Sequence, residues 1–92
     1  MEKDKEHRTI HTEILTFDGD EDRFKFKLDA LVGTVKAEAL ARFDIIPSSG
    51  VKYKLGEKKD GNFRILDDNN SLGTEGIQNK DTLWLGTEQQ VG

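Results

Sequence analysis

The sequence of 92 residues contains no cysteine and a single proline. Without cysteine the chain can form no disulfide, hold no thiolate metal site and carry no thioester on its own sulfur. It also lacks a basic excess, since 18 acidic residues outnumber 14 basic ones and the net charge is −4. This balance argues against nucleic acid and anionic membranes as partners. No apolar run approaches the length of a membrane span or of a signal peptide core, so we expect a cytoplasmic protein.

The apolar residues are sufficient for one small domain. Hydrophobic residues make up 34% of the chain, and a domain of this size buries only about three-fifths of its unfolded surface. Residues 1–8 alternate in charge without apolar periodicity, which predicts a mobile charged tail. We expect the folded domain over residues 9–87 and a flexible C-terminal tail over residues 88–92.

Two hydrophobic periods alternate along the chain. Residues 9–17 are rich in β-branched side chains and residues 23–28 alternate strictly, so together they predict a β-hairpin. Between residues 32 and 43 apolar side chains recur every three or four positions, which predicts a helix. Further short strands are expected at residues 51–55, 63–66 and 82–85. This order predicts an α+β fold in which one helix packs on a mixed sheet of four to five strands.

The segment from Leu72 to Leu85 resembles a stretch of ubiquitin. In both, a leucine precedes an Ile-Gln pair, here Ile77-Gln78, and then a Thr-Leu-x-Leu strand, here residues 82–85. The helical tripeptide at residues 35–37, Val-Lys-Ala, matches as well, and the count from Leu72 to Gly92 equals ubiquitin's own count to its terminal glycine. The resemblance covers about residues 9–92 and implies a ubiquitin-like β-grasp fold.

The resemblance also implies a protein modifier rather than an enzyme, with no cofactor. In such a modifier an E1-like enzyme activates the carboxylate of Gly92, an E2-like enzyme carries it, and target proteins accept it after a processing peptidase has exposed the terminus. The Val91-Gly92 ending is similar to that of the ubiquitin-fold modifier family, and bacterial ubiquitin-like modifiers are an equal match. Lys3 and Lys5 in the charged tail are candidate acceptors for a further copy.

This sequence departs from ubiquitin in its tail and in its recognition surface. The tail has one terminal glycine and no cation, so a ubiquitin-activating enzyme is not expected to accept it. Where ubiquitin has an aliphatic patch, the register places Lys54, Trp84 and Gly86. Alternation with Leu83 and Leu85 predicts that Trp84 faces away from the core, either as a partner-binding residue or covered by Lys54. The second functional hypothesis is therefore an unconjugated scaffold domain that binds partners, or itself, through this surface.

Other chemistry finds little support in the residue pattern. Asp18, Asp20 and Asp22 have the first spacings of a calcium loop, but Arg23 stands where the turn requires glycine. His7 and His11 are four residues apart, a spacing that suits a metal only on a helix. No serine lies near a histidine in the sequence, so we expect no catalytic residue and no metal site.

Overall fold

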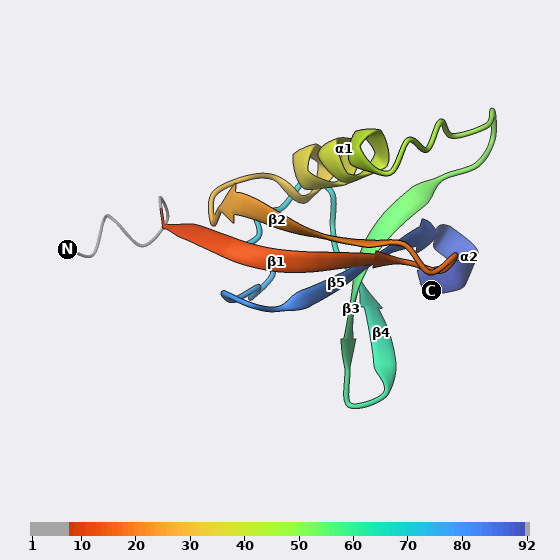
Figure 1. Ribbon diagram of the computed structural model, residues 1–92. Helices are drawn as coiled ribbons and strands as arrows, with labels where there is room; N and C mark the ends of the chain where they lie inside the picture. The colour runs from red at the N-terminus through yellow and green to blue at the C-terminus, as the bar shows by residue number, and fades with distance from the viewer. Residues whose placement is uncertain (1–7, 92) are drawn as a thin grey trace.

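The computed structural model describes residues 8–91, and these form a five-stranded sheet with one long helix packed on one face (Figure 1). The elements in chain order are β1 (Thr9–Thr16), β2 (Glu21–Lys27), α1 (Val32–Arg42), β3 (Tyr53–Lys59), β4 (Asn62–Ile65), β5 (Thr82–Thr87) and α2 (Glu88–Val91). The strand order is β2-β1-β5-β3-β4. β1 and β5 pair in parallel at the centre, and the other pairs are antiparallel. The predicted mixed sheet packed on one helix is therefore confirmed.

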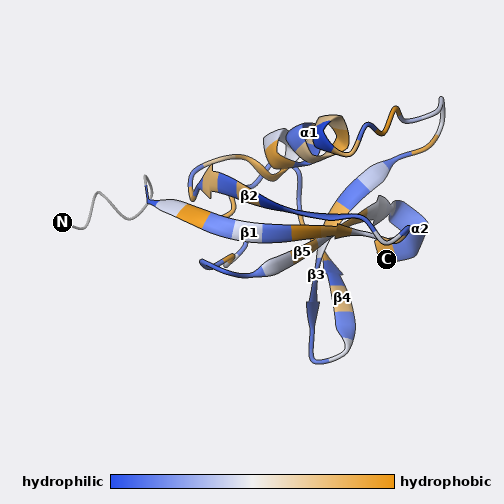
Figure 2. Cartoon of the chain, in the orientation of Figure 1, coloured by the Kyte–Doolittle hydropathy of each residue, from blue (hydrophilic) through white to orange (hydrophobic). Residues whose placement is uncertain are grey.

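The core lies between α1 and the sheet. Along β1 every second residue is buried, from Ile10 to Thr16, and Figure 2 shows the matching change of hydropathy along this strand. α1 contributes Val32, Val35 and Ala39 from one side, as its three- and four-residue spacing requires. The remaining fully buried aliphatic side chains of this core are Leu55, Leu66, Leu72, Leu83 and Leu85.

The polar stretch between β4 and β5 caps the start of α1 with its own backbone. Leu31 is the N-cap residue and makes no side-chain cap. Instead, the carbonyl oxygens of Asn70 and Asp68 accept hydrogen bonds from the first two helical amides, at 2.8 and 3.0 Å. The Asp68 carboxylate also receives the Lys36 ammonium at 2.6 Å. Free amides at a helix start need acceptors, so this loop and the helix stabilise each other.

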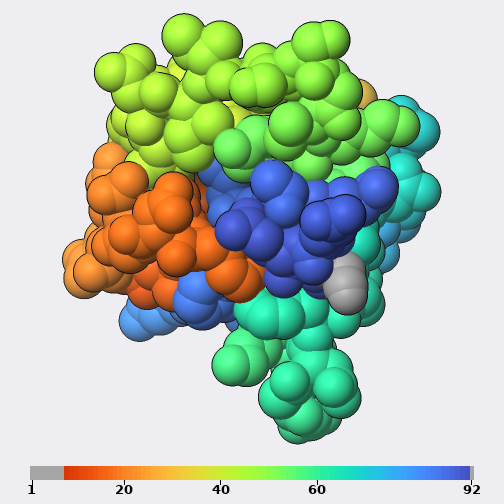
Figure 3. Space-filling view, turned by 90° about the vertical axis from the view of Figure 1, so that its right-hand side faces the viewer, coloured from red at the N-terminus to blue at the C-terminus, as the bar shows by residue number. Residues whose placement is uncertain are grey.

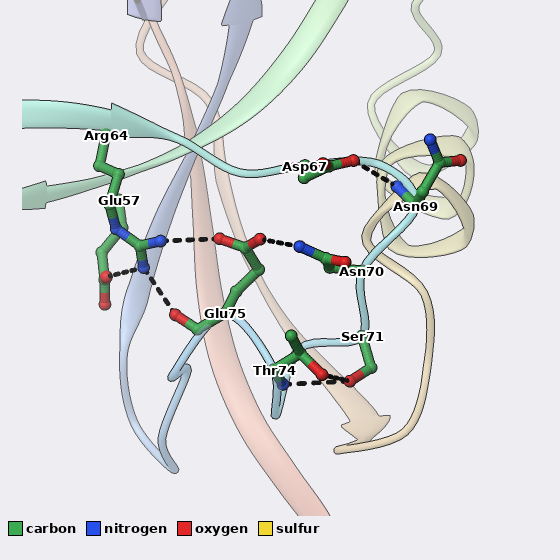
Figure 4. A network of polar contacts seen from close by, with 8 residues as sticks. All are labelled: Glu57, Arg64, Asp67, Asn69, Asn70, Ser71, Thr74 and Glu75. Carbon is green, nitrogen blue, oxygen red and sulfur yellow. Dashed lines mark hydrogen bonds and ion pairs between the residues drawn. The ribbon is translucent and has the colours of Figure 1, made fainter.

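A second set of polar contacts joins the β3–β4 hairpin to the same loop (Figure 4). The Arg64 guanidinium donates to the Glu57 carboxylate at 2.9 Å and to the Glu75 carboxylate and carbonyl oxygen, both at 2.7 Å. Both carboxylates are buried. The hydrogen bond to Glu57, followed by that to Glu75, raises the pKa of Arg64 above its ordinary value. Arg64 therefore keeps its charge and forms ion pairs with two carboxylates at once.

Another ion pair joins β2 to the C-terminal end of α1. The Arg42 guanidinium donates to the Asp22 carboxylate at 2.9 Å and lies 4.5 Å above the centre of the Phe24 ring. The hydrogen bond from Arg42, together with that from the Arg23 amide, lowers the pKa of Asp22. The contribution of this pair to stability is therefore present above the ordinary carboxyl pKa and is lost as the pH falls below it. Asp22 thus has a structural partner rather than a place in a calcium loop.

The C-terminal residues of the described chain are folded where we expected a flexible tail. Residues 88–91 form one helical turn, α2, and the Val91 side chain is only 1% exposed. The Glu88 amide donates to the Lys52 carbonyl oxygen at 3.0 Å and fixes the start of the turn. Residues 1–7, with Lys3, Lys5 and His7, and Gly92 lie outside the described residues. Over residues 8–91, no helix is long and apolar enough to cross a membrane.

We predict that Arg64→Lys destabilises the fold by about 1–3 kcal/mol, because one ammonium cannot satisfy both buried carboxylates. Arg42→Lys is the matched control: its pair with Asp22 is half exposed, so we expect little change in the free energy of unfolding. Urea unfolding of both variants measures the difference. Equal effects of the two substitutions would contradict the role assigned to Arg64.

Candidate functional site

The sheet face opposite α1, which we call the open face, is covered in part by the single helical turn α2, which packs on Gly56. Residues that pair directly across strands share a face, and the register pairs Leu15 with Trp84, Trp84 with Gly56, and Gly56 with Ile65. Alternation adds Phe17, next but one to Leu15, and Phe63, next but one to Ile65. Phe17 is 36% and Ile65 38% exposed. An apolar surface thus runs across the three central strands to β4.

Three aromatic rings form the middle of this surface, and we call Phe17, Phe63 and Trp84 the aromatic cluster. The centroid of the Trp84 ring lies 5.1 Å from that of Phe17 and 5.7 Å from that of Phe63, and the two Phe centroids are 5.7 Å apart. Trp84 and Phe63 meet edge to face, a geometry that aromatic quadrupoles favour. The Lys58 ammonium lies 5.7 Å from the Phe63 centroid.

Of the three residues that we predicted as one patch, Trp84 and Gly86 share the open face, but the Lys54 ammonium is directed elsewhere. Trp84 lies opposite the buried Leu83 and Leu85, as alternation requires, and is partly exposed. Lys54 pairs with Gly86 in the strand register, but its ammonium lies 3.6 Å from the Asp68 carboxylate rather than over the indole. The partners of Trp84 are instead Phe17 and Phe63. The sequence signal for both was alternation, since each continues the outward-facing series of its strand.

Gly86 lies buried beneath the aromatic cluster. A Cβ atom at this position would stand 2.7 Å from two carbon atoms of the Phe17 ring and 2.9 Å from Oε1 of Gln90. Those distances are shorter than carbon contacts allow. The missing side chain therefore lets Phe17 lie flat on β5 and brings α2 close to the cluster.

The charges on the open face are mostly positive, although the chain as a whole is acidic. On β2, the exposed side chains of Arg23, Lys25 and Lys27 alternate with the buried phenylalanines and so point to this face. Lys58 lies beside Phe63 on the other flank. Glu13 and Glu21, which pair with Arg23 and Leu15 in the register, are the acidic residues that the strands place here. Lys58 is thus the cation beside the aromatic cluster, while Glu21 stands in the cross-strand row of Trp84 and the β2 cations continue along the open face from Arg23 to Lys27.

The described residues offer little for catalysis or metal binding. Over residues 8–91, no group of three or more histidine and acidic side chains could hold a metal ion. A shallow hollow of about 450 Å³ lies beside the first half of β1, lined in part by His11, Glu13, Arg23 and Lys80. It brings together no nucleophile and base of the kind that acyl or phosphoryl transfer requires.

Comparison with known proteins places the fold. No protein-family model matches the sequence, and no curated protein matches it. Among solved structures, the ubiquitin of Caldiarchaeum subterraneum has a TM-score of 0.70 with 22% identity, over 88% of this chain and 95% of its own. The UBL domain of Plasmodium falciparum Dsk2 has a TM-score of 0.69 with 22% identity, over 88% of this chain and all of its own.

A third solved structure, described as a molecular mimicry of SUMO that promotes DNA repair, has a TM-score of 0.69 with 15% identity, over 87% of this chain and 92% of its own. The three likenesses show that this chain has the ubiquitin-like β-grasp fold, which confirms the predicted fold.

We predict that Gly86→Ala moves the Phe17 ring away from β5, since the added methyl group would overlap it. Both overlapping neighbours are ends of side chains, so the loss of stability should stay within about 1–2 kcal/mol. The emission of Trp84, the chain's single tryptophan, should shift to the red as its ring gains solvent. Gly73→Ala, where the nearest atom is a carbonyl oxygen at 3.4 Å, is the control and should leave the spectrum unchanged. An unchanged spectrum in Gly86→Ala would contradict this packing.

Proposed function

We propose that this chain is a ubiquitin-like domain that partner proteins recognise through the open face. The observation that supports this function is the aromatic cluster. Phe17, Phe63 and Trp84 contact one another in tilted and edge-to-face pairs at the surface rather than in the core. Aromatic side chains at the centre of a surface patch are the residues that contribute most to protein binding.

The partner segment that fits this face combines apolar and acidic side chains. Its apolar side chains would cover the aromatic cluster, and its carboxylates would lie near Arg23, Lys25 and Lys27 on one flank and Lys58 on the other. These cations are exposed, so they contribute more to the rate of association and to specificity than to affinity. Binding should therefore weaken as salt rises.

A random-peptide display library, selected on the immobilised domain, tests this proposal. We expect the enriched peptides to combine aliphatic or aromatic residues with aspartate or glutamate. Phe17→Ala and Trp84→Ala should each weaken their binding about tenfold or more, as truncation of a central interface residue does. Ile46→Ala is the control, because Ile46 is 89% exposed but lies in the α1–β3 loop away from the open face.

Two results would contradict the proposal. Peptides that bind Trp84→Ala and Ile46→Ala equally well would place recognition elsewhere. A concentration-dependent dimer that Trp84→Ala dissociates would make a second copy of the chain, rather than another protein, the occupant of the open face. Melting temperatures of both aromatic variants separate loss of binding from loss of fold.

Conjugation through Gly92 is the second candidate function. Its support is the sequence likeness to ubiquitin between Leu72 and Leu85. In this function an E1-like enzyme, an E2-like enzyme and a processing peptidase act on the chain, Val91 and Gly92 form the reacting end, and Lys3 and Lys5 are acceptors for further copies. The buried position of Val91 means that α2 must leave the sheet before an activating enzyme can enclose this end.

Deletion of Gly92 distinguishes the two functions. An amino-terminally tagged chain, expressed in its native cell, should form covalent adducts that survive denaturing electrophoresis, and mass spectrometry should find Val-Gly remnants on target lysines. The deletion should abolish the adducts and leave peptide binding at the open face unchanged. Absence of adducts from both forms would contradict conjugation and leave the docking function standing.

A further inference from the structure

The C-terminal turn α2 lies on the open face against a glycine. A Cβ atom at Gly56 would stand 3.3 Å from Cβ and 3.5 Å from Cγ1 of Val91, and 3.4 Å from the Arg64 carbonyl oxygen. Gly56 does not have a positive φ, so its backbone does not need glycine. What it provides is space. The surface above Gly56, between Trp84 and Ile65, is what we call the seat of Val91. This seat exists because residue 56 has no side chain.

Few other contacts hold this turn. Of the four residues in α2, only Val91 is buried, and Glu88, Gln89 and Gln90 are exposed. The hydrogen bonds from the Gln90 amide to Thr87 Oγ1, at 3.3 Å, and from the Thr87 amide to Gln90 Oε1, at 2.9 Å, are local. A helix of one turn has no stability of its own. The docked position therefore depends on one valine side chain and on the hydrogen bond from the Glu88 amide to the Lys52 carbonyl oxygen, and segments with so few contacts open more readily than the core.

The seat of Val91 adjoins the surface to which the proposed partner binds. Across the strands, Gly56 pairs with Trp84 of the aromatic cluster on one side and with the exposed Ile65 on the other. Gln90 also lies against Gly86, beside Phe17. In Figure 3 the blue residues of α2 lie between the orange β1–β2 turn and the teal β3–β4 hairpin. A partner bound to the aromatic cluster would therefore contact α2 while Val91 occupies its seat.

We propose that α2 is a reversible latch that blocks part of the open face, and that its release exposes the seat of Val91 to an aliphatic side chain of the partner. In the closed state the chain's own valine fills the seat. In the open state a partner residue of similar size, such as valine or isoleucine, takes its place. This inference rests on the proposed docking function, but the latch itself can be measured without any partner.

Hydrogen exchange in the full chain tests the latch directly. Gly56→Val fills the seat without changing a tail residue, and should speed amide exchange at Glu88 and Gln90 about tenfold or more relative to the unchanged chain. Amides of Leu55 and Leu85 in the core report on the stability of the fold. The control is Gly73→Ala, whose added methyl group also meets a carbonyl oxygen at 3.4 Å but lies against Leu28. It should change amide exchange neither in α2 nor in the core.

Two exchange results would overturn the latch. One is exchange at Glu88 and Gln90 that Gly56→Val leaves unchanged. The other is exchange at these amides in the unchanged chain as slow as in the core, since α2 would then open only with global unfolding. Neither result depends on peptide binding, so failure of the latch can be told apart from failure of the docking function.

Two variants with opposite effects on the seat test its role in binding. Val91→Ser empties the seat, so peptides selected on the unchanged chain should bind several-fold more tightly. Gly56→Val opens the latch but fills the seat, and should give no such gain. Equal affinities in Val91→Ser and the unchanged chain, or a gain in both variants, would overturn the assignment of the seat as part of the partner's site.

Discussion

The parallel pairing of β1 with β5 is the contact on which the rest of the structure depends. It joins strands from opposite ends of the domain, so everything between them must cross from one side of the sheet to the other. α1 makes that crossing over one face and buries its apolar stripe there. On the other face, the single turn α2 packs on Gly56. The same pairing sets Leu15 beside Trp84 and so assembles the surface on which the proposed function rests.

Two glycines decide how that open face is used. At Gly86 the missing side chain admits the Phe17 ring, and at Gly56 it admits Val91. In each case an apolar group from elsewhere in the chain occupies space that a side chain of the strand would otherwise fill. The open face is therefore partly covered by groups that can move, since Phe17 ends a strand and Val91 lies in a single helical turn. A surface built in this way can bind a partner by exchanging its own cover for the partner's side chains.

The loop between β4 and β5 is fixed largely by polar contacts. It buries Leu72 and Ile77, and its other residues form hydrogen bonds and ion pairs. Asp68 caps α1 through its carbonyl oxygen and pairs with Lys36 through its carboxylate, while Arg64 forms ion pairs with Glu57 and Glu75. Because unpaired buried carboxylates are costly, these contacts fix a segment that has few side chains in the core.

Local sequence pattern is sufficient to predict the element order, the faces of the strands and the outward position of Trp84, because hydrophobic period and β-branched content act over a few neighbouring residues. Which side chains meet depends on contacts between distant parts of the folded chain. Phe17 directly follows β1, whereas Phe63 and Trp84 belong to β4 and β5, and the Lys54 ammonium pairs with the Asp68 carboxylate rather than with the indole. The same holds for residues 88–91, which are polar except for Val91. Their local pattern indicates a tail, and they fold because strands brought together from distant parts of the chain provide a seat for one valine.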